Sequence, residues 1–165
     1  MADQASDQQP LANGADTAPA AGIISQYIKD LSFENPNAPA IFQSQAAPGI
    51  DVQFNIGAAQ VGEEVHEVTL KIDVRAEVDG QVAFIVDLSY SGLFGFRNVP
   101  VDQIQPFMLT EAPRLLFPFA RRVLADTVRD GGFPPLLLEP IDFAQLYMQQ
   151  SQGQGEELSG EFGTA

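Results

Sequence analysis

The chain has 165 residues, of which 22 are acidic and 8 are basic, so its formal net charge is -14. So few lysines and arginines do not form the basic stripe that a nucleic acid requires, and an anionic membrane surface would repel the chain. The hydrophobic content of 45% is too high for a wholly disordered acidic chain. Length and composition therefore predict one folded domain with no nucleic-acid partner.

The two ends of the chain differ in composition from its middle. Residues 1–22 and 150–165 are rich in small and polar residues and carry acids but no bases, which predicts two disordered acidic tails around a folded domain at 23–149. The chain has no cysteine, and none of its apolar runs is long enough to span a bilayer. We therefore expect a cytoplasmic protein that does not insert into a membrane.

Residues 23–34 predict the first strand. Asp30 and Glu34 share one parity, so both carboxylates are expected on one face, whereas Tyr27, Leu31 and Phe33 are expected on the other. Acidic side chains on a sheet face are ordinarily just solvated, and the functional alternative is a docking patch for a basic partner.

Prolines dominate the next segment, 35–39. Each proline fixes its backbone angle and removes a hydrogen-bond donor, so the strand must end there. The chain is then expected to cross over in an extended segment that carries Ile41 and Phe42.

The clearest strand is predicted over residues 65–78, where apolar and polar side chains alternate for six pairs. Asp79-Gly80 supplies a two-residue hairpin turn. The returning strand is expected to carry five apolar side chains on one face, namely Val82, Phe84, Val86, Leu88 and Tyr90. A shorter strand around 52–56 precedes the hairpin, so the strands predict an antiparallel meander.

From about residue 102 the apolar period becomes helical. Leu116, Ala120, Val123, Leu124, Thr127 and Val128 form a stripe that ends at Gly131-Gly132. Pro113 and Pro118 interrupt this pattern, which predicts two helical pieces or one kinked helix. Asp142 is placed to cap a short last helix.

Catalytic and metal-binding patterns are weak. His66 is the only histidine and lies among Glu63, Glu64 and Glu67, but a strand turns Glu63 and Glu67 away from it. The chain has neither a nucleophile elbow nor a phosphate-binding loop. We therefore predict no metal, no cofactor and no catalytic residue.

An apolar surplus lies in or near the predicted loops and the interrupted helix. It comprises Leu93, Phe94, Phe96, Phe107, Phe117, Phe119, Phe133, Leu136, Leu137 and Leu138. Loops that fold back over the core would bury these side chains. A domain of this size buries about two-thirds of its unfolded surface, so part of the surplus is expected to meet another subunit or an apolar ligand.

Five short motifs are recognisable together. They are Lys-Asp-Leu-Ser-Phe-Glu at 29–34, Pro-Asn-Ala-Pro at 36–39, Leu-Leu-Phe-Pro-Phe-Ala-Arg at 115–121, Gly-Gly-Phe-Pro at 131–134 and Pro-Ile-Asp-Phe at 140–143. In this order, over residues 23–149, the chain closely resembles SecB, the export chaperone of proteobacteria.

The resemblance implies an α+β fold: a four-stranded antiparallel sheet of order 1-4-3-2, a long interrupted helix and a short C-terminal helix. It also implies a homotetramer, a dimer of dimers, without catalytic activity. Such a chaperone would hold unfolded precursor proteins and hand them to SecA, the motor ATPase of export. The alternative is a SecB-like chaperone dedicated to an antitoxin or another specific partner.

The resemblance also implies roles for residues. SecA binding would fall on Asp30, Glu34 and Asp87, the last of which replaces a glutamate of the family. Client binding would fall on Ile41, Phe42, Leu93, Phe94, Phe133, Leu136 and Leu138. Positions that affect assembly would be Val86, Leu88 and Tyr90.

Overall fold

The computed structural model describes residues 18–152 and 158–164. Its strands form one antiparallel sheet in the order β1-β4-β3-β2-β5. The strands are β1 (Ala20–Glu34), β2 (Gly49–Gly62), β3 (Val65–Val78), β4 (Gln81–Arg97) and β5 (Leu158–Thr164). The first four strands confirm the predicted order 1-4-3-2.

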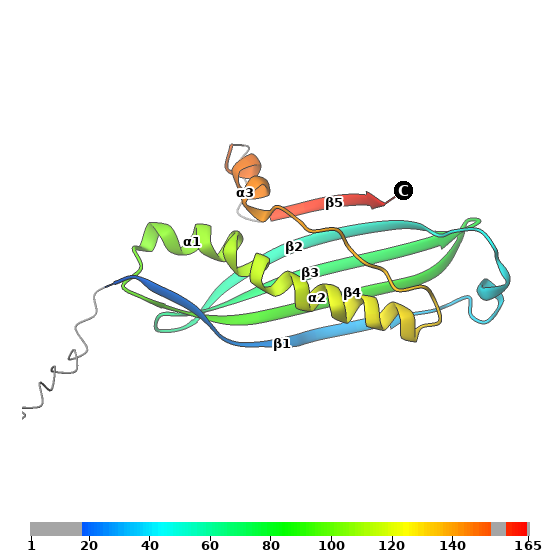
Figure 1. The fold of residues 1–165 in the computed structure, drawn as a ribbon, viewed down its shortest axis with the longest axis horizontal. Helices are drawn as coiled ribbons and strands as arrows, with labels where there is room; N and C mark the ends of the chain where they lie inside the picture. Colours follow the sequence, from blue (N-terminus) through cyan, green and yellow to red (C-terminus); the bar gives the residue numbers. More distant parts are fainter. Residues whose placement is uncertain (1–17, 153–157, 165) are drawn as a thin grey trace, which may run out of the picture.

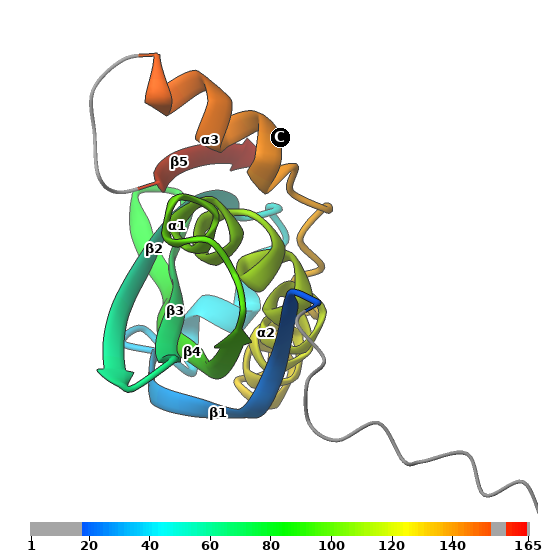
Figure 2. The same ribbon diagram turned by 90° about the vertical axis from the view of Figure 1, so that its left-hand side faces the viewer.

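The three α-helices of the described residues lie on one side of this sheet, and a short helix lies in the crossover beyond its end (Figures 1 and 2). They are the short η1 (Ala40–Gln43), α1 (Val101–Leu109), α2 (Glu111–Asp130) and α3 (Phe143–Ser151). The expected interruption of the long helix is confirmed. Its predicted position is wrong: the break occurs at Thr110, whose φ of -124° and ψ of -69° leave the helical region, whereas Pro113 and Pro118 both lie inside α2.

We call the sheet face beneath α2 the covered face and the opposite one the open face. On the covered face every second residue of β3 is buried, from Val68 to Val78. The predicted stripe of α2 packs onto them, and Leu116, Ala120, Leu124 and Val128 have no exposed area. The apolar side chains that recur at every second residue of β3 and about every 3.6 residues of α2 therefore pack together in a single core.

Three predicted chain reversals and caps are confirmed. Asp79 and Gly80 have φ values of 52° and 77°, which suit a two-residue hairpin. Gly132 has a φ of 94° beyond the end of α2, where Phe133 N–H donates to Val128 O at 3.3 Å, and this closes the helix. Asp142 caps α3, because its Oδ1 accepts from Gln145 N–H at 3.0 Å.

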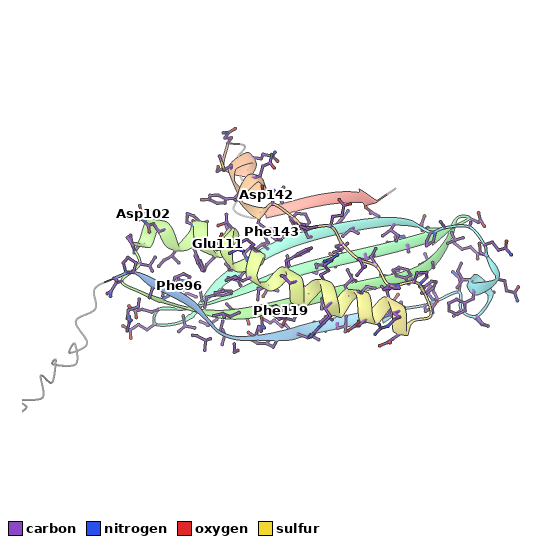
Figure 3. All side chains as sticks on the ribbon, in the orientation of Figure 1. Phe96, Asp102, Glu111, Phe119, Asp142 and Phe143 are labelled. Carbon is purple, nitrogen blue, oxygen red and sulfur yellow. The ribbon has the colours of Figure 1, made fainter. Side chains whose placement is uncertain are left out.

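The cap of α3 brings an aromatic side chain into the core. Phe143 follows Asp142 and is 2% exposed, with its ring edge-on to those of Phe54 and Phe117 at centroid distances of 6.0 and 6.1 Å. Asp142 and Phe143 line a hollow together with Glu111 at the start of α2 (Figure 3). α3 is thereby fixed next to the break between α1 and α2.

Of the register shifts in the sheet, one in β1 and one in β4 correct the predicted faces. In β1, Ile28 pairs with Tyr90 and Asp30 with Ser89, so Lys29 is an extra residue. The prediction that Tyr27 shares a face with Leu31 and Phe33 is therefore wrong, since Tyr27 lies on the open face opposite Ser91.

The second bulge lies in β4. Ala76 pairs with Phe84, but Glu77 pairs with Val82, so Ala83 is the extra residue. The prediction that Val82 shares the covered face with Phe84 is wrong, because Val82 lies opposite the exposed Glu77. In both strands one additional residue reverses the parity that alternation predicts.

Two loops also differ from their predictions. β4 continues to Arg97, so Leu93, Phe94 and Phe96 lie in a strand and not in a loop. The crossover after β1 is not extended: it forms turns followed by η1, which holds Ile41 and Phe42. Asn35 and Asn37 fix this compact path by donating from Nδ2 to Gly131 O at 2.9 Å and to Val82 O at 2.8 Å.

The ends of the chain are described in part. Residues 1–17, most of the predicted N-terminal tail, lie outside the described residues, as do 153–157 and 165. Within the segment predicted as a disordered C-terminal tail, Leu158–Thr164 pairs with β2 from Ile56 to Ile50. None of the helices in the described part of the chain has the length and apolarity needed to cross a membrane.

Candidate functional site

The three predicted docking carboxylates lie on the open face. Asp30 pairs with Ser89, Ser32 with Asp87 and Glu34 with Ile85. Residues that pair across an antiparallel ladder share a face. Asp30, Glu34 and Asp87 are thus brought together on β1 and β4; the first two are exposed and Asp87 is half-buried. We call them the acidic surface.

Asp73 on β3 extends this surface and was not predicted. It pairs directly with Asp87, and burial together with the Asp87 carboxyl raises the pKa of Asp73, while Lys71 opposes the rise. Without the bulge at Ala83, the hairpin would set Asp73 opposite Val86 instead. The sequence therefore holds no simple signal for this carboxyl pair.

A second polar cluster lies on the same face and spans three strands. Tyr27 Oη donates to Glu67 Oε2, and Lys29 Nζ donates to Glu67 Oε1 at 2.6 Å. These two bonds hold the pKa of Glu67 below its usual range, and the Glu67 carboxylate raises the pKa of Tyr27 to about 12. At neutral pH the cluster is thus a carboxylate between a phenol and an ammonium group.

An aromatic cluster joins the crossover to the loop after α2. The Phe133 ring lies 5.2 Å from that of Phe42 and 4.8 Å from that of Phe84, and Phe84 stacks on Phe33 at 6.1 Å. Phe42 is 47% exposed, whereas Phe84 is buried. Two segments that are far apart in the sequence therefore form one partly exposed apolar surface.

Glycines allow this close approach. A Cβ atom on Gly131 would lie 2.1 Å from the Phe33 ring, and one on Gly132 would lie 2.9 Å from the Phe42 ring. The Gly-Gly pair thus ends α2 and also admits two aromatic rings against its backbone.

The other predicted client-binding residues have different exposures. Leu93 is half-buried on the open face and Phe94 is fully buried on the covered face, because neighbours in a strand alternate. Ile41, Leu136 and Leu138 are buried as well, at 5–9% exposure. Leu137 was not among the predicted site residues, yet it is 62% exposed. In an extended run of three leucines the middle side chain points away from the other two, and this alternation could have identified Leu137 as the exposed one.

Val86, Leu88 and Tyr90 belong to the core of the chain. Their exposures are 0%, 0% and 6%, and they lie on the covered face. Apolar side chains that remain exposed occur elsewhere: Ile23, Ile24, Ile28 and Leu31 on β1, and Leu115 and Phe119 on α2. β1 is also an edge strand, so one of its sides pairs with no other strand among the residues that the structure describes.

His66 makes an aromatic contact. Its ring packs edge-on against Phe96 with centroids 5.3 Å apart. Within residues 18–152 and 158–164, no three His, Cys, Asp or Glu side chains gather as a metal site would require.

Comparisons with known proteins agree on one family. The family described as preprotein translocase subunit SecB matches residues 14–154. The "Protein-export protein SecB" of Sphingopyxis alaskensis is 66% identical over 147 residues, covering 88% of this chain and 86% of that protein. The protein of the same name from Zymomonas mobilis is 63% identical over 145 residues, covering 87% and 88%.

A solved structure has the same fold. It is the SecB-like chaperone of Mycobacterium tuberculosis in complex with a peptide from an antitoxin. Its TM-score is 0.63 at 17% sequence identity, and the match covers 73% of this chain and 90% of that one. At this identity the likeness extends to the fold alone.

Proposed function

This chain belongs to the SecB family of preprotein translocase subunits, and we propose on that premise that it is an export chaperone that holds unfolded precursor proteins and delivers them to SecA. The observation that carries the proposal is the combination of two separate surfaces in one chain. The aromatic cluster is apolar and partly exposed, and the acidic surface lies on the open face. One suits an unfolded client and the other a basic partner.

Client holding requires no reaction. A protein that binds the unfolded state slows folding by mass action, and several weak apolar contacts along one client raise the effective concentration of the next. Phe42, Phe133 and Leu137 are the side chains that would touch the client, since each retains exposed or half-exposed area. Ile41, Phe94, Leu136 and Leu138 would support this surface from beneath.

SecA docking would use the acidic surface. Asp30, Glu34 and Asp87 present carboxylates from two neighbouring strands. Such a patch would attract a basic segment of SecA and increase its association rate and specificity. Client and SecA could then bind together, because the two surfaces do not share residues.

Assembly into a homotetramer, a dimer of dimers, would cover the exposed apolar side chains of β1 and α2. If a second copy added its own β1 antiparallel to this edge, the outward backbone N–H and C=O groups of the two β1 strands would pair with each other. Val86, Leu88 and Tyr90 are buried beneath α2, so they would affect assembly by setting the position of α2 and not by direct contact. The chaperone would act in the cytoplasm, where precursors are met before export.

The holding activity is tested by diluting a denatured precursor into buffer with and without the purified protein. We expect refolding to be delayed in proportion to the protein added, and light scattering to give the mass of a tetramer. Phe42→Ser should weaken the delay, because it removes an exposed ring. Met148→Ser, at a 62% exposed apolar side chain of α3 that belongs neither to the aromatic cluster nor to the apolar surface of β1 and α2, is the control for client binding. A tetramer that leaves refolding unchanged would contradict the proposal.

Docking is tested by the double variant Asp30→Lys/Glu34→Lys. We expect it to lose SecA binding in a titration and to keep the refolding delay. The control is Asp51→Lys/Asp102→Lys, which makes the same charge change at two exposed positions away from the acidic surface. If the first variant binds SecA as tightly as the control does, the acidic surface is not the docking site.

The alternative, a chaperone dedicated to an antitoxin, is less well supported. The relatives at 63–66% identity are named for protein export, whereas the structure with an antitoxin peptide shares only 17% identity. A pulldown that recovers one stoichiometric client and no SecA would favour the alternative.

A further inference from the structure

Glu67 connects β1 to β3 across the strand that separates them. The sheet order places β4 between β1 and β3, and Leu93 of β4 pairs with Glu67. Even so, Tyr27 and Lys29 of β1 both reach the Glu67 carboxylate, one to each oxygen. The Glu67 side chain is 16% exposed and that of Lys29 is 52% exposed. We call these three residues the clamp.

The clamp includes the extra residue of the β1 bulge. Lys29 is that residue, and Tyr27 lies two positions before it on the same open face. Along β1, Ile28 pairs with Tyr90 and Leu31 with Leu88, so both side chains lie on the covered-face side of this edge strand, where they remain 48% and 38% exposed. Two side chains three positions apart in a strand lie on the same face only when a bulge residue stands between them.

The bulge decides where Asp30 points. In an unbulged strand that keeps Ile28 inward, Lys29 would point outward and Asp30 inward, towards the apolar core. With Lys29 inserted, Asp30 returns to the open face, and Ser32 and Glu34 follow it. The geometry of the acidic surface therefore depends on an irregularity that the ladder itself does not stabilise.

The clamp also affects charge. Lys29 is adjacent to Asp30, and a free ammonium group there would offset the negative potential that a basic partner meets. Its ion pair with Glu67 directs the ammonium group towards β3.

We propose that Glu67, through Tyr27 and Lys29, is a positioning residue that fixes the β1 bulge and so holds Asp30 and Glu34 in the arrangement that SecA recognises. This inference rests on the proposed docking function. It assigns a role to three residues that do not belong to the acidic surface themselves.

Lys29→Met separates positioning from simple electrostatics. The substitution removes a positive charge beside the acidic surface, so electrostatics alone predicts tighter SecA binding. Loss of the clamp predicts weaker binding, by about tenfold in Kd, as for one lost charged contact. Tyr27→Phe and Glu67→Leu should weaken binding in the same direction. Glu77→Gln is the matched control, because it alters a β3 glutamate whose 2.9 Å bond is to Arg75 and not to β1.

Amide hydrogen exchange supplies a second measurement on the same variants. Exchange should accelerate at residues 29–31 in Lys29→Met and Glu67→Leu, and stay at the wild-type rate in Glu77→Gln. Unchanged or tighter SecA binding by Lys29→Met, with the wild type binding normally, would overturn the inference and leave the docking proposal standing. A wild-type protein that does not bind SecA at all would overturn both.

Discussion

The two faces of the sheet show how one set of strands serves two purposes. On the covered face, Val86 and Leu88 are fully buried against α2, and the alternation of β3 is apolar without exception from Val68 to Val78. On the open face the same strands carry Asp73 and Asp87 in direct opposition. The covered face therefore supplies stability, whereas the open face keeps a like-charge pair that costs stability and suits a basic partner. The following predictions test that difference.

The largest effect is expected from a charge on the covered face. Leu88→Asp places a carboxylate among apolar side chains and should lower the free energy of unfolding by about 5 kcal/mol, enough to abolish a cooperative transition. Ser89→Asp, one residue further on the open face between Lys71 and Asp30, should change it by less than about 1 kcal/mol. Urea unfolding measures both, and equal losses would show that the faces do not differ.

The next largest effect is expected when a methyl group is added to a glycine on each face of the sheet and the losses of stability are compared. A Cβ on Gly92 would lie 2.8 Å from Leu116 Cδ2 and 3.0 Å from the Phe94 ring. Gly92→Ala should therefore cost about 2 kcal/mol by overpacking. On the open face, no atom of the described residues lies within 4 Å of a Cβ placed on Gly57, so Gly57→Ala should be neutral or stabilise by about 0.5 kcal/mol. A neutral Gly92→Ala would mean that α2 moves freely on the sheet.

The pH dependence of stability should differ between two carboxyl groups of the open face, those of Asp73 and Glu67. The pKa of Asp73 is raised in the folded chain, so its ionised form is penalised, and the penalty disappears as the pH falls below the unfolded value. Asp73→Asn should therefore stabilise the protein by about 0.5 kcal/mol at neutral pH, and the gain should vanish in acid.

Glu67 should behave in the opposite way. Its pKa is lowered in the folded chain, so its contribution to stability is present above the unfolded pKa and is lost as the pH falls through the folded pKa. Glu67→Gln should be less stable than the wild type at neutral pH and equal to it in strong acid. Urea midpoints from neutral pH down to about pH 3 measure both variants. If the stability differences of Asp73→Asn and Glu67→Gln from the wild type changed with pH in the same direction, the opposite pKa shifts of Asp73 and Glu67 would be contradicted.

The smallest effect is expected from an exposed ion pair. Arg75 Nε and Glu77 Oε1 are 2.9 Å apart, with both side chains about half exposed. Arg75→Gln should change the free energy of unfolding by less than about 0.5 kcal/mol, because water screens the pair. A larger loss would show that charge pairs on the open face contribute to the fold.

Local errors in the sequence-based predictions had one main cause. Alternation placed Tyr27 and Val82 on the wrong faces, because an extra residue, Lys29 in β1 and Ala83 in β4, separates each of them from the residues grouped with it. Nothing in the local composition marks Lys29 or Ala83 as the extra residue. A bulge is stabilised by contacts to other strands, which a pattern within one segment does not contain.

The sequence predicted the positions of some residues of the candidate site but not those of others. Asp30 and Glu34 were expected on one face from parity, and this held because both lie beyond the bulge. The family resemblance implied a client-binding role for both Phe42 and Phe133, but the contact between their rings was not predicted. Phe94 and Leu138 are buried, since exposure of an apolar side chain depends on what packs over it and not on its own type.

The sequence by itself determined the elements and their order: the strand at 65–78, the turn at Asp79-Gly80, the helix stripe that ends at Gly131-Gly132 and the cap at Asp142. These depend on local periodicity, backbone preference and caps, which neighbouring residues specify. Only the tertiary structure decided that Asp73 meets Asp87 and that Lys29 meets Glu67. Those pairs depend on the register between strands, which long-range packing sets.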